Sequence, residues 1–186
     1  MNVINLPERN DRLESFKEQA EIQGFNFRVW QGKIDLVAVF RAISDAHKQI
    51  VIDAKINGLN HVCIAEDDIK FNCKGAWNYY LENIPKEFDL YLGMVYEGKI
   101  ENNKLVNNPY TFSGLSLYTV SSRFYDRFLS MNSMAHLDKE LGKFAGRYDY
   151  YVVPEFVCYQ MDGYSDQKKK DCKYDHLLKG RKLFGV

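Results

Sequence analysis

The stretch His61-Val62-Cys63-Ile64-Ala65-Glu66-Asp67-Asp68 decides the fold, because an apolar run is followed at once by three consecutive acids. The run 61–65 predicts a buried strand. The acids come where the chain leaves that strand. In open α/β sheets, ligands bind beyond the carboxyl ends of the strands. The acidic triplet therefore marks a candidate site.

Predicted strands and helices alternate outward from this stretch. Before it lie a strand at 3–6, a helix from Asn10 or Asp11 to Gly24, a strand at 25–30 and a helix at 36–56 that Ser44 or Asp45 can break or cap midway. After it come a helix at 75–84, strands at 88–93, 115–120 and 150–153, a loop or hairpin at 97–109, and short helices near 124–129 and 138–144. This order predicts an α/β fold with a parallel or mixed sheet covered by helices.

The composition fits one globular domain. The chain has 186 residues, of which 46% are hydrophobic and 27% charged. Lys plus Arg equals Asp plus Glu at 25 each, so no global field attracts nucleic acid, and no nucleic-acid partner is expected. The 13 Tyr and 12 Phe suit either a core or a sugar-binding surface.

The sequence also predicts a location and a boundary. No secretory signal and no transmembrane segment are apparent, and four cysteines without CxxC spacing indicate reduced thiols in a cytoplasmic protein. Residues 1–166 form the predicted domain, and 167–186 a basic, mobile arm. Its lysines 168–170 suit a solvated tail, a cover over a diphosphate, or peripheral contact with an anionic membrane.

The acidic triplet can carry metal chemistry. If strand alternation continues through it, Glu66 and Asp68 face one side and Asp67 the other. Two carboxylates on one side are hard oxygen ligands for Mg²⁺ or Mn²⁺, and such an ion can bridge the phosphates of a nucleoside diphosphate. The alternative is a solvated acidic turn.

Two other features surround this site in the sequence. In Asn5-Leu6-Pro7-Glu8-Arg9-Asn10-Asp11-Arg12, two arginines three residues apart stand near a strand-to-helix junction. They can hold phosphate or orient acids, or they can pair with nearby acids on an exposed helix start. His47 lies in the predicted helix 36–56, where a single histidine is more often a hydrogen-bonded structural residue than a ligand.

These features together resemble glycosyltransferase family 25, the lipopolysaccharide-type β-galactosyltransferases. Segment 5–12 is similar to the family's Asn-Leu-x-x-Arg-x-Asp-Arg opening. With His47 placed on the family histidine, Gly58 and the triplet 66–68 fall on the family's Gly and Glu-Asp-Asp motif without a gap. Segments 27–32, 88–93, 114–121, 136–138 and 153–165 resemble later motifs, so the likeness covers about residues 1–166. The chain departs at Ala46, where the family has Ser, at Ala65, and in its short length.

The resemblance implies a GT-A type fold, with a Rossmann-like nucleotide-binding half joined to an acceptor half in one domain. It implies an inverting, metal-dependent transfer of a hexose, galactose among the candidates, from a UDP-sugar to a saccharide, a lipid-linked saccharide or another hydroxyl acceptor. The Mn²⁺ or Mg²⁺ ligands would be Asp68 and Glu66, the latter directly or through water or ribose. Acceptor contacts are expected on loops 97–109 and 145–149.

The resemblance also assigns roles to further residues. It implies a nucleotide-binding role for Asn5, Arg9 and Arg12, and a place in the donor pocket for His47. It implies that Asp138 is the general base, with Asp162 as the rival base or a third contact of the metal site.

Two other functions remain open. Ala46 and the short chain favour an inactive homologue that binds a nucleotide or carbohydrate. A metal-dependent nuclease or phosphotransferase could use the same carboxylates, but a Lys-bearing Gly-rich loop and a basic face are missing.

Overall fold

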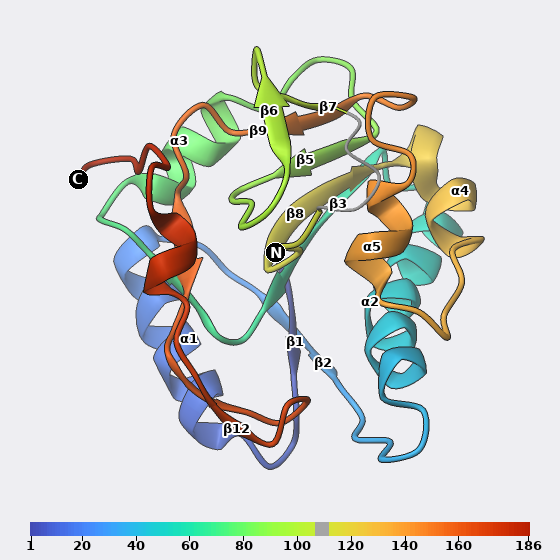
Figure 1. The fold of residues 1–186 in the computed structure, drawn as a ribbon, viewed down its shortest axis with the longest axis vertical. Coiled ribbons are helices and arrows are strands. Elements are labelled where there is room, and N and C mark those ends of the chain that lie inside the picture. Colours follow the sequence, from blue (N-terminus) through green and yellow to red (C-terminus); the bar gives the residue numbers. More distant parts are fainter. Residues whose placement is uncertain (107–111) are drawn as a thin grey trace.

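The computed structural model describes residues 1–106 and 112–186, arranged around one eight-stranded sheet (Figure 1). The strand order is β2-β1-β3-β8-β5-β9-β7-β6. The strands are β1 Asn2–Asn5, β2 Arg28–Gln31, β3 His61–Glu66, β5 Leu90–Leu92, β6 Lys99–Glu101, β7 Lys104–Val106, β8 Leu117–Ser121 and β9 Tyr150–Val152.

The sheet is mixed, as the sequence predicts. Strand β1 lies parallel between β2 and β3, and β9 lies parallel to β5. Strand β8 runs antiparallel to both β3 and β5 and joins the two parallel parts. Strands β6 and β7 form a hairpin inside segment 97–109, which was predicted to be a loop or a hairpin. Residues 107–109 of this segment lie outside the described residues.

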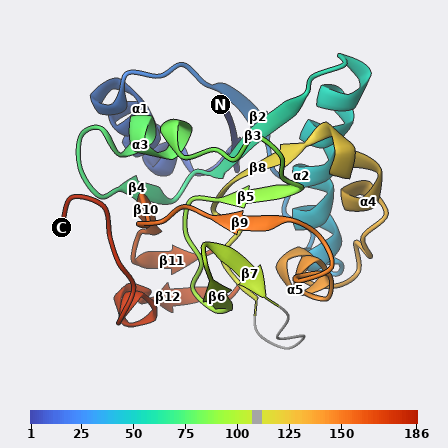
Figure 2. The same cartoon turned by 90° about the horizontal axis from the view of Figure 1, so that it is seen from above.

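Helices cover both faces of the sheet. Helices α1 (Asn10–Gln23) and α3 (Ala76–Glu82) lie on one face, and α2 (Val39–Ile56), α4 (Tyr125–Leu129) and α5 (Leu137–Gly142) on the other (Figures 1 and 2). A short 3₁₀ helix, η1 (Ser122–Phe124), precedes α4. The predicted Rossmann-like sheet flanked by helices is therefore confirmed. Within the described residues, no helix is both long and apolar enough to cross a membrane.

Three local predictions were wrong. Helix α2 is continuous through residues 44 and 45. Ser44 is fully buried, and its hydroxyl hydrogen-bonds that of Ser133, in the loop between α4 and α5, instead of capping a break. Helix α1 begins after Arg9 without a side-chain cap, although Gly24 ends it in the predicted left-handed conformation. The strand predicted at 25–30 forms only from Arg28, because Phe25 packs onto Phe16 and other core rings.

Most of the large aromatic side chains fill the core. The Tyr80 and Tyr91 rings stack at a centroid distance of 4.6 Å, and each hydroxyl donates to the other residue's carbonyl oxygen. Fully buried aromatic residues include Phe16, Tyr80, Tyr91, Tyr118, Phe124, Phe128 and Tyr150. For these rings, the core alternative is correct.

The carboxyl-terminal part of the chain folds beside the acidic end of β3. Strand β10 (Cys158–Gln160) pairs with β4 (Ile69–Phe71), which directly follows the acids. Strand β11 (Gly163–Ser165) pairs with β12 (Lys170–Cys172), and the 3₁₀ helix η2 (Asp175–Leu178) comes next. The predicted domain boundary at 166/167 lies in the turn of this β11–β12 hairpin. The mobility of residues 167–186 stays a prediction.

Candidate active site

A cavity of about 750 Å³ opens at the carboxyl end of β3. This volume lies in the usual range of ligand pockets. Its wall comes from the β1–α1 and β2–α2 loops, α2, the β3–β4 turn, α5 and the β11–β12 hairpin. Five of the predicted site residues line it, namely Arg12, His47, Glu66, Asp68 and Asp138.

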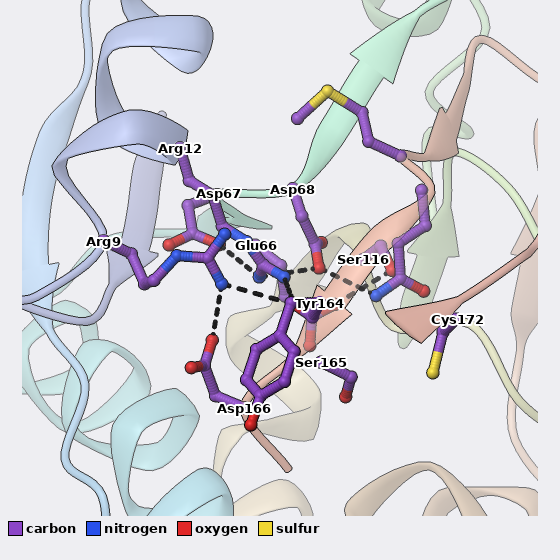
Figure 3. A network of polar contacts seen from close by, with 12 residues as sticks. Arg9, Arg12, Glu66, Asp67, Asp68, Ser116, Tyr164, Ser165, Asp166 and Cys172 are labelled. Carbon is purple, nitrogen blue, oxygen red and sulfur yellow. Dashed lines mark hydrogen bonds and ion pairs between the residues drawn. The ribbon is translucent and has the colours of Figure 1, made fainter. Parts of the chain in front are cut away.

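The three acids do not alternate as a strand would. Strand β3 ends at Glu66, and Asp67 and Asp68 form the turn before β4, so all three side chains line the cavity. The prediction that Asp67 faces away is wrong, because pleat geometry stops where the strand stops. Arg12 Nη1 lies 3.2 Å from Asp67 Oδ1 and 2.9 Å from Asp68 Oδ2 (Figure 3). One guanidinium thus joins two neighbouring carboxylates.

Asp68 is a buried acid, and only one of its two carboxylate oxygens has hydrogen-bond partners. Its Oδ2 accepts hydrogen bonds from Arg12 and from Gln160 Nε2, the latter at 2.9 Å. Its Oδ1 is buried and has no hydrogen-bond partner. Burial, together with the neighbouring Glu66 charge, raises the pKa of Asp68 to about 7. A buried carboxylate oxygen without a partner is chemically suited to accept a cation or a hydrogen-bond donor.

Glu66 belongs to a second chain of polar contacts. Its Oε2 accepts from the Ser116 hydroxyl at 2.9 Å, and its Oε1 lies 3.7 Å from His47 Nε2. His47 Nδ1 lies 2.7 Å from the Tyr118 hydroxyl. Burial opposes ionisation of Glu66, but His47 and Ser116 outweigh it, and the pKa stays below the ordinary value. His47 is therefore both a buried, hydrogen-bonded residue and part of the cavity wall.

Asn5 and Arg9 stand behind the cavity wall. Asn5 is buried, and its amide donates to Asp67 Oδ2 at 2.7 Å and to the Arg9 carbonyl oxygen at 3.0 Å. Arg9 pairs with Asp11 at 2.8 Å and with Asp166 at 2.6 Å. Neither residue lines the cavity, so both position the residues that do.

The two candidate bases lie in different surroundings. Asp138 is half-buried at the start of α5 and lines the cavity, and burial raises its pKa above the ordinary value. Asp162 is exposed, accepts a hydrogen bond from the Tyr174 amide at 2.7 Å, and is not part of the lining. Only Asp138 stands where a group in the cavity could give it a proton.

The sequence alone indicated no role for two partners of the acids and one partner of His47. Ser116 lies 50 residues from Glu66, Gln160 lies 92 residues from Asp68, and Tyr118 lies 71 residues from His47. All three stand inside segments 114–121 and 153–165, and the resemblance of these segments to family 25 is the signal that could have found them. No local pattern links them to the triplet.

The donor set fits a divalent cation held in part by a ligand. Among the described residues no group of three or more His, Cys, Asp or Glu could hold a metal ion. Mg²⁺ and similar ions are commonly held by one or two carboxylates plus substrate phosphates, without an all-protein cage. Asp68 Oδ1, with the charge of Glu66 nearby, is a candidate for one such carboxylate ligand.

Known structures share this architecture. A glycosyltransferase involved in the glycosylation of the major capsid of PBCV-1 is similar at a TM-score of 0.56 and 14% identity, over 95% of this chain and 96% of that one. Drosophila β-1,4-galactosyltransferase 7, solved with manganese, UDP-Gal and xylobiose, is similar at 0.55 and 9%, over 100% and 80%. The chain has a GT-A-like fold.

Other comparisons set the limits of this result. The protein A197 from STIV is also similar, at a TM-score of 0.53 and 8% identity over 91% of this chain and 90% of that one. Neither a protein-family model nor a curated protein sequence matches the chain. At these identities the GT-A-like likeness establishes the fold, and the chemistry must be argued from the cavity.

Proposed function

We propose that the chain is a glycosyltransferase that moves a hexose from a UDP-sugar to a hydroxyl group of a saccharide acceptor. The observation that carries this proposal is the buried Asp68 Oδ1, which has no hydrogen-bond partner. It belongs to a residue that lines a cavity of about 750 Å³ at the carboxyl end of β3 in a GT-A-like fold. Ligands of α/β sheets bind at this edge. The presence of UDP-Gal and manganese in the similar galactosyltransferase structure supports the choice of donor and cation.

Asp68 and Glu66 would hold the cation. When bound, Mn²⁺ or Mg²⁺ neutralises charge on a diphosphate and makes it a better leaving group. Arg12 holds Asp68 Oδ2, which leaves Oδ1 for a cation. Tyr118 orients His47, and His47 with Ser116 fixes Glu66.

Asp138 is the proposed general base. Its carboxylate would take the proton of the acceptor hydroxyl while that oxygen bonds the anomeric carbon and the bond from that carbon to the diphosphate oxygen breaks. Because the attack comes from the side opposite the leaving group, the anomeric configuration inverts. A carboxyl with a raised pKa suits this task, since it holds a proton more readily at neutral pH.

Family 25 supplies the finer form of this proposal. The likeness of residues 5–12 and 66–68 to its motifs supports a galactose-type donor and a lipopolysaccharide-like acceptor. The lipid-linked form of the acceptor, contact with a membrane surface and the cytoplasmic location stay predictions.

A second candidate function rests on Ala46 and Arg12. Ala46 lines the cavity beside His47, at the position where family 25 has a hydroxyl. Arg12 already neutralises part of the acidic turn. These observations favour an inactive homologue that binds the nucleotide-sugar without transferring it.

Calorimetry and turnover separate these functions. We expect UDP to bind wild type more tightly with Mn²⁺ than with EDTA, and Asp68→Asn to lose that difference. UDP binding that is equal in both proteins and independent of metal would exclude the cation site.

Asp138→Asn should keep UDP binding but lower the rate of UDP-galactose consumption about 10²- to 10⁴-fold. Exposed Asp162→Asn is the matched control and should change the rate less than twofold. Wild type that binds UDP-galactose but neither transfers nor hydrolyses it would favour the binding module.

A further inference from the structure

The β11–β12 hairpin brings a basic run to the cavity that holds the acids. Lys168 and Lys169 lie in its turn, and Lys173 follows β12. All three line the cavity with Glu66–Asp68. Lys170 belongs to the same run, on β12, but does not line the cavity. The fold therefore places three of these lysines at the cavity and one outside it.

Among the side chains that the structure describes, which leave out those of residues 107–111, 175 and 177, no carboxylate forms a salt bridge with Lys168, Lys169 or Lys173. By contrast, Arg12 and Lys139, which also line the cavity, pair with acids. Lys168, Lys169 and Lys173 thus add positive charge to this wall that no described carboxylate pairs with, although Lys168 Nζ lies 5.6 Å from the centroid of the Tyr174 ring.

The hairpin is fastened to the acidic turn. Arg12 Nη2 donates to the Tyr164 carbonyl oxygen at 2.8 Å while its Nη1 holds Asp67 and Asp68 (Figure 3). Arg9 Nη1 pairs with Asp166 in the hairpin turn at 2.6 Å. These contacts hold the lysines at the cavity. Because Asp166, the one acid of the turn, pairs with Arg9, it does not compete with an anionic ligand for the lysines.

We propose that Lys168, Lys169 and Lys173 bind the diphosphate of the nucleotide in the cavity that they line together with Asp68. This inference rests on the proposed function and adds a binding element to the same site. Ammonium groups are common phosphate binders and act as point charges. As the bond from sugar to diphosphate breaks, negative charge grows on the diphosphate, and the lysines stabilise it.

The position of the lysines favours a soluble diphosphate over an anionic membrane. A membrane surface would attract every exposed lysine of the run, Lys170 included. A ligand inside the cavity would select the three that line it. The two ligands are thus separable by which lysines matter.

The test compares two triple variants with the same change in net charge. K168A/K169A/K173A removes the lysines of the cavity. K86A/K170A/K179A removes three exposed lysines outside its lining. Binding of UDP, UMP and uridine is measured by calorimetry at low salt, with EDTA and with Mn²⁺, and thermal unfolding checks that both variants fold.

We expect K168A/K169A/K173A to bind UDP about ten- to a hundredfold more weakly, UMP less affected, and uridine unchanged. The control variant should bind UDP within twofold of wild type. K168R/K169R/K173R should restore most of the UDP affinity, since it restores the charge. Equal UDP affinity in the two alanine variants would overturn the proposal, as would an equal loss for uridine.

Two further outcomes are distinguishable. If wild type does not bind UDP at all, the proposed function fails, and the diphosphate site fails with it. If UDP binding is unchanged but K168A/K169A/K173A no longer sediments with phosphatidylserine vesicles, the lysines bind a membrane and the diphosphate site is wrong.

Discussion

Two turns with runs of like charge line the same cavity, and they differ in burial and in the partners of their charged groups. The acidic β3–β4 turn, with Asp67 and Asp68, is buried, and each acid is held by partners from distant segments. The basic turn at Lys168–Lys169 is exposed, and its ammonium groups have no carboxylate partners among the described residues. Burial, and not the number of charges, decides what a charge costs the fold. Changes in the acidic turn should therefore have the larger effects on stability.

The largest expected effect on stability follows from removing the Arg12 guanidinium, which lies between the buried Asp67 and Asp68. Arg12→Met leaves Asp67 and Asp68 uncompensated, and we expect the free energy of unfolding to fall by about 3 kcal/mol. Urea denaturation measures it. Arg28→Met is the control, because Arg28 pairs with Asp53 on the surface and should contribute only about 0.5 kcal/mol. Equal losses in the two variants would contradict the contrast between the turns.

The next effect is a pH dependence at Asp68. Its pKa lies at about 7 in the fold against an ordinary value of 3.8, so between these values the folded protein binds more protons than the unfolded chain. From pH 4.5 to 8 the free energy of unfolding must then fall by about 3 kcal/mol, and it levels off above this range.

Denaturation of wild type and Asp68→Asn with EDTA from pH 4.5 to 8 checks this sign. The stability of Asp68→Asn relative to wild type should increase with pH. If the free energies of unfolding of wild type and Asp68→Asn changed with pH in parallel, the pKa of Asp68 would not be raised in the folded protein.

A smaller effect on stability is expected at Tyr118, which contacts His47 and not the acids themselves. Tyr118→Phe removes the hydroxyl that lies against His47 Nδ1 and leaves that buried nitrogen without its partner. We expect a loss of about 1 to 2 kcal/mol in the free energy of unfolding. The exposed Tyr164→Phe should change it by less than about 0.5 kcal/mol. A neutral Tyr118→Phe would show that the hydroxyl does not hold His47.

The smallest effect should fall on the basic turn. Arg9→Ala breaks the ion pair with Asp166, and because this pair is partly exposed we expect a loss of about 0.5 to 1 kcal/mol. Amide hydrogen exchange of residues 163–172 should become faster, while that of β3 stays unchanged. Asp11→Ala removes the other partner of Arg9 and should leave the hairpin protected. Faster exchange in both variants would mean that Asp166 does not anchor the turn.

Much of the fold was predictable because its signals are local. The apolar run before Glu66, the glycine that ends α1 and the alternation of strands and helices depend on neighbouring residues, and the mixed sheet follows from them. Boundaries were less predictable. Residues 25–27 are not part of the strand, although the sequence pattern predicts it there, because Phe25 and Phe27 pack against Phe16. A contact of this kind cannot be predicted from neighbouring residues.

The candidate site was predictable in part. The sequence by itself placed an acidic triplet at the end of a buried strand. The resemblance to a known family marked Arg12, His47 and Asp138, which all line the cavity. Only the tertiary structure decided that Arg12 bridges Asp67 and Asp68, that Gln160 donates to Asp68, and that the basic hairpin lines the same cavity. The physical reason is that these contacts join segments 55 to 92 residues apart, where packing and charge across the fold, and not local preference, choose the partners.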